Sequence, residues 1–386
     1  MLYFIVEGDL YMRKVWKNID KPLLIVTVVL FMLGAVMVFS ASNVTAYMSH
    51  AVSPYNYFIK QVVFLVAGLI LALFMIRIPS KGYYALSWLL LLGFGASLVL
   101  LLIMGQAKNQ AISWFDLGLF SVQPSEFIKV ISIVWVAGYY ETNLKHLNTY
   151  GKSLFPMLVC GIIAGLIFLQ PDLGTTIIYT LIVGLIFLLV PIAKDIKYKT
   201  IIGIFGLVAV AGFILMTSGK GLLLDRQKDR FNFSRPCDSL ITNGNQVCNC
   251  YIAINNGGLF GVGLGNSTQK YLYLPEPYTD FIYAIIVEEL GVFTGILLIL
   301  AYMFVIYRIL QIGKKSNTAR GSIMCYAIAF YIFLHIAVNL LGIMGLMPMT
   351  GVPLPFMSYG GSFTICLIAA LTIVQRISIE SKHAKK

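Results

Sequence analysis

The sequence has few charged residues. Asp, Glu, Lys and Arg make up 11% of its 386 residues, and 59% are hydrophobic. Soluble domains carry about 25% charged residues, so this scarcity argues against a soluble fold and predicts a polytopic membrane protein. The net charge of +12 would suit nucleic acid, but the basic residues are dispersed among short loops. That dispersal is typical of cytoplasmic loops, and we expect no nucleic-acid partner.

Cysteine and histidine are also scarce. The chain has six Cys and four His, without a CxxC pair or a Cys/His cluster, so no motif predicts a metal site. Three of the cysteines lie in apolar runs, where we expect them to act as small hydrophobic residues. The others, Cys237, Cys248 and Cys250, lie in a long polar loop. Both a Cys237–Cys248 disulfide and free thiols fit that loop.

Long apolar runs make up most of the sequence. A helix that crosses a membrane needs about 20 apolar residues. Ten runs approach that length: 23–42, 59–76, 84–104, 125–141, 154–170, 173–191, 200–217, 281–307, 321–345 and 359–376. The predicted fold class is therefore an all-α polytopic membrane protein with about ten transmembrane helices.

The placement of Lys and Arg predicts the orientation. With the N-terminus inside, every short inside loop is basic, so both termini are expected in the cytoplasm. The predicted organisation is a cytoplasmic segment at 1–22, helices 1–7 within 23–217, an extracytoplasmic loop at 218–280, helices 8–10 within 281–376, and a cytoplasmic tail at 377–386.

The predicted outer loop is long and rich in Gly and charge. Its Gly-rich run, 250–265, is too short to cross a membrane, and we expect a re-entrant or interfacial piece. Glycines in this run would let backbone N–H groups approach phosphate, or would serve close packing. Basic residues such as Arg226 and Arg230 predict either contacts to a pyrophosphate or a solvated mixed-charge surface.

Asp280 lies where this loop becomes a hydrophobic span, within the stretch 271–291 around which the chain is organised. Thr279 is a plausible N-cap, with Asp280 in the first helical turn. Asp280 would then only neutralise the helix N-terminus. Alternatively, it is a general base at the outer membrane surface. Glu276 is a second carboxylate or metal ligand, or else a solvated loop charge.

Three more ionisable residues, Glu126, Lys129 and Asp172, lie at the outer ends of the fourth and sixth spans. Intramembrane charges are costly and point to function by default. They form either a buried ion-pair network between helices or the lining of a polar cavity that opens toward the outer loop. For Glu288 and Glu289, deeper in the eighth span, we expect a hydrogen bond with a buried base instead.

Five segments in this order resemble the SEDS family, the polytopic glycosyltransferases of bacterial cell-wall synthesis that include FtsW and RodA. They are DKPLLIVTVVLFMLGAVMVFSAS (20–42), FSVQPSEFIKV (120–130), FLQPDLGTT (168–176), the stretch 253–291 and GLMPMTGVPLPFMSYGGS (345–362). The resemblance covers most of the chain, and the run GVGLGNSTQK is more similar to FtsW than to RodA.

The resemblance implies an inverting glycosyltransferase that polymerises lipid II at the outer face of a bacterial cytoplasmic membrane. Asp280 is then the catalytic residue, and a divalent cation, Mg or Mn, is expected. The expected partners are lipid II, a class B penicillin-binding protein transpeptidase and other division proteins. The residues expected to line the substrate cavity are Glu126, Lys129, Asp172, Lys270, Glu276, Ser358 and Gly360.

The chain departs from the family pattern at three places. Residues 109–114 lack the basic pair common in N-G-x-R-R-W, residues 248–250 read Cys-Asn-Cys where the pair QS is usual, and His335 stands where Gln is common. Other interpretations stay open: a lipid II flippase or transporter, an elongation-type polymerase, and a non-catalytic scaffold for division proteins.

Overall fold

The computed structural model describes residues 15–50, 52–104, 113–116, 118, 120–203, 206, 237, 242–271 and 273–383. Its helices are α2 (Lys21–His50), α3 (Asn56–Met75), α4 (Ser80–Met104), α5 (Pro124–Thr142), α6 (Tyr150–Phe168), α7 (Leu173–Leu189), α10 (Thr242–Gly257), α11 (Ile282–Lys314), α12 (Ala319–Ile343) and α13 (Gly361–His383). A short antiparallel pair, β1 (Phe115–Asp116) and β2 (Ser121–Val122), precedes α5, and the 3-10 helix η1 (Leu144–His146) follows it.

Each predicted span except 200–217 coincides with one of these helices, and 200–217 lies mostly outside the described residues. Seven of the described helices are long and apolar enough to cross a membrane. α5 falls outside that set because it carries Glu126, Lys129 and Glu141, and α7 is shorter. The prediction of an all-α polytopic membrane protein is confirmed.

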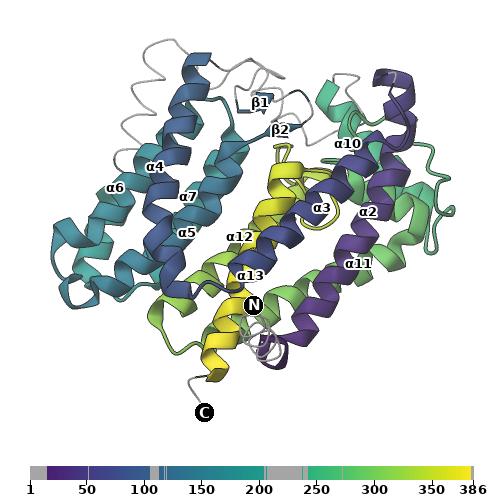
Figure 1. The fold of residues 1–386 in the computed structure, drawn as a ribbon. Helices are drawn as coiled ribbons and strands as arrows, with labels where there is room; N and C mark the ends of the chain where they lie inside the picture. Colours follow the sequence, from purple (N-terminus) through teal and green to yellow (C-terminus); the bar gives the residue numbers. More distant parts are fainter. Residues whose placement is uncertain are drawn as a thin grey trace, which may run out of the picture.

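The centre of the molecule is formed by α12 and α13. In Figure 1 they stand between α4–α7 on one side and α2, α10 and α11 on the other. Most of α12 and α13 is buried, at 72% and 78%, whereas only 11% of α3 is buried. The peripheral helices therefore turn apolar side chains outward, as a lipid-facing layer does.

α11 is not a continuous helix. Gly291 has φ 87° and ψ 162°, a conformation that interrupts the helix and that favours glycine. Four main-chain hydrogen bonds of 2.9–3.2 Å join residues 258–263 to residues 288–293 and satisfy the groups that the break frees. A Cβ at Gly257 or Gly261 would overlap the α11 backbone.

These contacts decide between the two interpretations of the Gly-rich run. The N–H groups of Val262 and Gly263 donate to carbonyls of α11, so they do not face a phosphate. At Gly257 and Gly261 the glycines serve close backbone packing. Part of the predicted outer loop is helical and forms α10. That the Gly-rich run 250–265 enters the membrane or its interface stays a prediction.

The two adjacent acids of α11 hold this loop in place. Glu288 accepts hydrogen bonds from the Ser267 hydroxyl and from both N and Oγ1 of Thr268, the latter two at 3.1 and 2.8 Å. Glu289 Oε1 lies 3.0 Å from Lys270 Nζ, and all of these acidic and basic groups are buried. The prediction of a hydrogen bond with a buried base is therefore confirmed for Glu289, whereas Glu288 is bound by hydroxyl and main-chain donors and not by a base.

Candidate functional site

Asp280 lies in a turn rather than in a helix. The N-cap of α11 is Phe281, and its first turn contains no acidic residue. The prediction that Thr279 caps this helix is therefore wrong. Thr279 Oγ1 donates instead to Glu276 O at 2.9 Å, which closes a turn in the segment that contains Pro275 and Pro277. The interpretation of Asp280 as a first-turn residue fails with it.

The main chain that carries Asp280 is held by residues that lie far from it in the sequence. The carbonyls of residues 278–280 accept one hydrogen bond each, from Tyr359 N at 2.8 Å, Ser358 Oγ at 2.6 Å and Asn339 Nδ2 at 2.9 Å. Ser358 Oγ also accepts from Leu354 N at 2.8 Å. These donors come from α12 and from the segment between α12 and α13, so that segment fixes the backbone of the turn.

The Asp280 side chain is half-buried and faces the same segment. Its Oδ2 lies 3.5 Å from the position that a Cβ on Gly351 would take, and Gly351 has φ 71°. The Pro/Gly-interrupted stretch 348–362 therefore forms a wall beside the carboxylate. Glu276 is exposed in the same turn.

Three tyrosines pack beside this turn, and none was singled out from the sequence. Tyr57 of α3 lies 4.4 Å from Tyr278 and 5.2 Å from Tyr359 between ring centroids. Burial raises the pKa of Tyr278, and it raises the pKa of Tyr359 to about 12. Both phenols therefore stay protonated at neutral pH.

A buried cluster centres on Lys129. Its Nζ lies 2.8 Å from Glu126 Oε1 and 3.1 Å from His335 Nε2. An ammonium only donates, so Nε2 is the acceptor and Nδ1 carries the proton, which points at Pro353 O 3.4 Å away. His335 thus connects the ion pair to the segment beside Asp280, a contact that its sequence position did not reveal.

Asp172 does not join this ion pair. It is the N-cap of α7, where its carboxylate accepts from Thr175 N at 3.0 Å and from Gln123 Nε2 at 3.0 Å. Gln123 N in turn donates to Ser362 Oγ at 3.0 Å. The three-residue network predicted from the sequence is therefore two systems, an ion pair on α5 and a capped helix start on α7.

Part of the cluster has unmet hydrogen-bonding capacity. Within the described residues, Glu126 Oε2, Ser125 Oγ and Tyr331 OH are buried without a hydrogen-bond partner. Buried polar atoms are rarely left unpaired, and such atoms mark places where water or a polar ligand enters. The cluster is thus both an ion pair and a surface fit to line a polar cavity.

The remaining predicted site residues are dispersed. Lys270 is enclosed and bound to Glu289, and Gly360 N lies 3.4 Å from Gln61 Oε1 at the start of α13. The residues Arg226 and Arg230 lie outside the described part of the chain. The expected roles of all four in substrate binding stay predictions.

The described cysteines answer two further expectations. Cys237 and Cys248 form a disulfide, the pairing put forward from the sequence, and the cysteines of the apolar runs are buried and free. Among the described residues, no group of three or more His, Cys, Asp or Glu side chains gathers as a metal site.

Comparison with known proteins identifies the family to which this chain is similar. The model of the FtsW, RodA and SpoVE family, described as cell cycle protein, matches residues 21–383. The probable peptidoglycan glycosyltransferase FtsW of Bacillus subtilis is 35% identical over 384 residues, covering 97% of this chain and 94% of that protein. The stage V sporulation protein E of the same organism is 33% identical, with 94% of this chain and 98% of that protein covered.

Two solved structures share the fold. A chain of a peptidoglycan synthase complex that coordinates polymerization and crosslinking matches with a TM-score of 0.73 and 22% identity, covering 94% of this chain and 98% of that one. The rod shape determining protein RodA of Thermus thermophilus matches with a TM-score of 0.64 and 23% identity, covering 93% and 96%.

Proposed function

Because the chain belongs to the cell cycle protein family of FtsW, RodA and SpoVE, we propose that it is a peptidoglycan glycosyltransferase. Its substrate is lipid II, the disaccharide-pentapeptide linked to undecaprenyl pyrophosphate, which it polymerises into glycan strands for septal synthesis. The reaction takes place at the outer face of the cytoplasmic membrane. An apolar lipid tail and a polar sugar suit a multi-pass protein whose acid lies at the start of a long apolar helix.

The position of Asp280 carries this proposal. A general base must be held within hydrogen-bond reach of the hydroxyl that it deprotonates. The three hydrogen bonds to the carbonyls of residues 278–280 fix the backbone, and the carboxylate itself is half-buried beside Gly351. A fixed, partly exposed carboxylate in this turn is suited to accept a proton from a bound sugar.

The reaction proceeds in one displacement with inversion. Asp280 takes the proton of the acceptor sugar's 4-hydroxyl, and that oxygen attacks the anomeric carbon of the donor. The bond between this carbon and the pyrophosphate oxygen breaks, and undecaprenyl pyrophosphate leaves with the electron pair. A divalent cation, Mg or Mn, would offset the charge on the leaving group when bound, as would positive side chains. Asp280 and Glu276, four residues apart, are the carboxylates available in this turn for such a cation.

The Lys129 cluster supports the site rather than performing the displacement. Its ammonium is engaged by Glu126 and His335, and His335 reaches the backbone of the segment that walls Asp280. Its unpaired polar atoms, Glu126 Oε2 and Tyr331 OH among them, offer contacts to a polar part of the substrate or to water.

A class B penicillin-binding protein is the proposed partner. The solved chain with the same fold comes from a complex that couples polymerization to crosslinking. A polymerase whose product must be crosslinked gains from a transpeptidase at the point where the strand emerges. Other division proteins are expected to bind the same assembly.

The test separates a polymerase from a transporter. The purified chain, with a class B transpeptidase, receives labelled lipid II and Mg or Mn, and the products are resolved on a gel. In parallel, the chain in liposomes receives lipid II in one leaflet. Glycan strands support the proposal. Transfer of lipid II across the bilayer without any strands would establish the transporter instead.

A further inference from the structure

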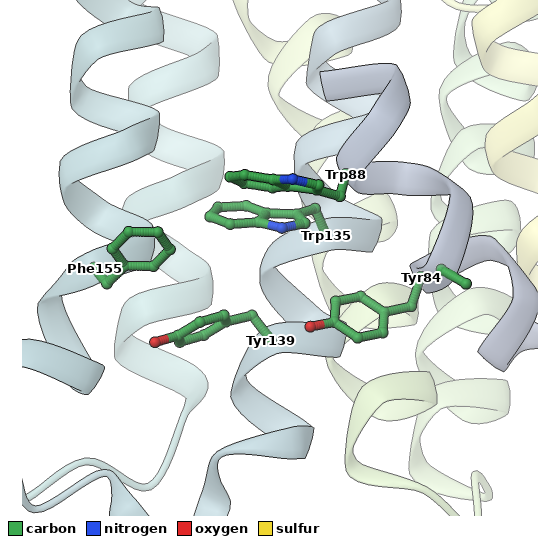
Figure 2. A pocket seen from close by; sticks show the side chains of 6 residues that line it. Tyr84, Trp88, Trp135, Tyr139 and Phe155 are labelled. Carbon is green, nitrogen blue, oxygen red and sulfur yellow. The ribbon is translucent and has the colours of Figure 1, made fainter. Parts of the chain in front are cut away.

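Side chains of α4, α5 and α6 line an aromatic groove (Figure 2). These helices stand on the side of the molecule away from α11 (Figure 1). The groove has a volume of about 350 Å³. The residues that line it are Tyr84, Ala85, Trp88, Trp135, Tyr139 and Phe155. No residue of the candidate functional site is among them.

The groove is built into the packing of α4 against α5. Trp135 is buried and forms its floor, with the Trp88 ring stacked on it at 5.4 Å between centroids. A Cβ on Gly138 would overlap the Tyr84 ring, so glycine at this position allows Tyr84 to lie directly on α5. Phe155 of α6 packs against Trp135 at 6.1 Å and closes the far side.

The groove opens toward the lipid. Trp88 is 43% exposed and Phe155 is 41% exposed, on helices that the hydropathy assigns to the membrane. An apolar groove at membrane depth is filled by whatever chain the bilayer offers. Its aromatic walls and its volume suit an acyl chain.

Two lysines lie at one end of the groove. Lys81 precedes Tyr84 by three residues on α4, and Lys152 precedes Phe155 by three residues on α6, so each lies on the groove-facing side of its helix, one turn from a lining ring. Both are exposed, and neither forms an ion pair with the described residues. In Figure 2 the rings of Tyr84 and Tyr139 lie below the stacked indoles, toward this end.

Two of the described acids toward this end of α5 and α13 are already paired. Glu141, in the last turn of α5, binds Arg320 at 3.0 Å, and Glu380 of α13 binds Arg376 at 3.0 Å. The charge of the two lysines is therefore available to an anionic group from outside the protein. Long lysine side chains reach the headgroup level from a helix end.

We propose that this groove binds an anionic phospholipid. One acyl chain lies along Trp88, Trp135 and Phe155, and the phosphate lies between Lys81 and Lys152. Basic pockets between helices are the form that such headgroup sites take. The two positive charges favour an anionic phospholipid over a neutral lipid or the apolar helix of a protein partner.

Tryptophan quenching tests the proposal directly. The chain has four Trp, and changing Trp16 and Trp114 to Phe leaves Trp88 and Trp135 as reporters in the groove. This protein is placed in vesicles that contain either dibrominated phosphatidylglycerol or dibrominated phosphatidylcholine, and the quenching is compared at equal mole fraction. Each lysine near a membrane surface contributes on the order of a fivefold preference for anionic lipid, so the pair should give at least about a tenfold preference.

Matched variants locate the effect. The double change Lys81→Gln and Lys152→Gln should reduce the preference to about one, since both side chains are exposed and their loss leaves the fold intact. The control, Lys314→Gln with Lys315→Gln, removes the same charge from the exposed end of α11 and should keep the full preference. Ala85→Phe should fill the groove and reduce quenching by both lipids.

Two results would overturn the proposal. Equal quenching by the two lipids would show that any acyl chain enters and that the lysines select nothing. Absence of quenching by either lipid would show that protein, from a second copy or a partner, closes the groove.

Discussion

At the scale of single residues, the position of Asp280 depends on side chains far away in the sequence. Ser358, Asn339 and the Tyr359 N–H donate hydrogen bonds to the carbonyls of residues 278–280. In the sequence, the stretch 348–362 is marked only by its resemblance to the family pattern. The side-chain bonds around the Asp280 turn required the folded chain, because they link residues 59 and 79 positions apart.

Ser358→Ala tests this positioning. The change leaves Thr279 O and Leu354 N without their partner, and each buried unpaired group costs about 1–3 kcal/mol. We expect a lower unfolding temperature and a fall in polymerisation rate with lipid II affinity unchanged. The control, Ser97→Ala, removes a hydroxyl that bonds its own helix at Phe94 O and should change neither property. Full activity of Ser358→Ala would contradict the positioning role.

His335 should make the protein sensitive to acid. Protonation of Nε2 would remove the acceptor for Lys129 and place two positive charges 3.1 Å apart. The other groups that face this pair are Glu126, which is bound to Lys129, and Tyr331, whose ring packs against the His335 ring. Proton uptake therefore favours the unfolded state, and stability falls as the pH is lowered.

His335→Gln is the matched variant for this prediction. Its amide can accept from Lys129 and donate to Pro353 O without gaining a proton. The unfolding temperature of the unmodified protein should fall as the pH is lowered below about 6.5, where histidine in the unfolded chain gains its proton. The same scan with the Gln variant should be flatter. Parallel curves for the two proteins would show that His335 does not cause the acid sensitivity.

At the scale of elements, the break in α11 defines the outer half of the molecule. The long apolar run of this helix was enough to predict it. The run contains no proline, so the sequence did not predict that the helix is interrupted. The break exists because residues 258–263 supply main-chain partners from outside the helix. Only the positive φ of Gly291, visible in the fold, reveals it.

Gly291→Ala should disrupt this arrangement. A Cβ there would overlap Leu259 O, and alanine at φ 87° is strained, which together cost several kcal/mol, on the order of 2–6. We expect a large fall in folded yield, measured by fluorescence-detected size exclusion. Gly184→Ala in α7, where a Cβ meets nothing within 4 Å, should leave the yield unchanged or raise it. Equal yields from the two variants would contradict the account.

At the scale of the whole molecule, two buried helices organise the rest. α12 contacts α5, α7, α11 and α13, so the Lys129 cluster on α5 and the Asp280 turn before α11 both attach to one rigid centre. Apolar runs were enough to predict the long apolar helices, because membrane depth restricts the backbone to helices, whereas α10 lies in the polar loop and was not predicted. The pairing of Lys129 with His335 was not predictable, since 206 residues separate them.

The central claim is that Asp280 is the base of a lipid II polymerase. Its most direct test compares Asp280→Asn with Glu276→Gln, the neighbouring carboxylate in the same turn, in the lipid II polymerisation assay with the transpeptidase partner. Loss of a general base lowers the rate by about 10²–10⁴-fold. The account predicts that loss for Asp280→Asn, with unchanged insertion and partner binding, and a much smaller effect for Glu276→Gln. Polymer made by Asp280→Asn at the normal rate would contradict it.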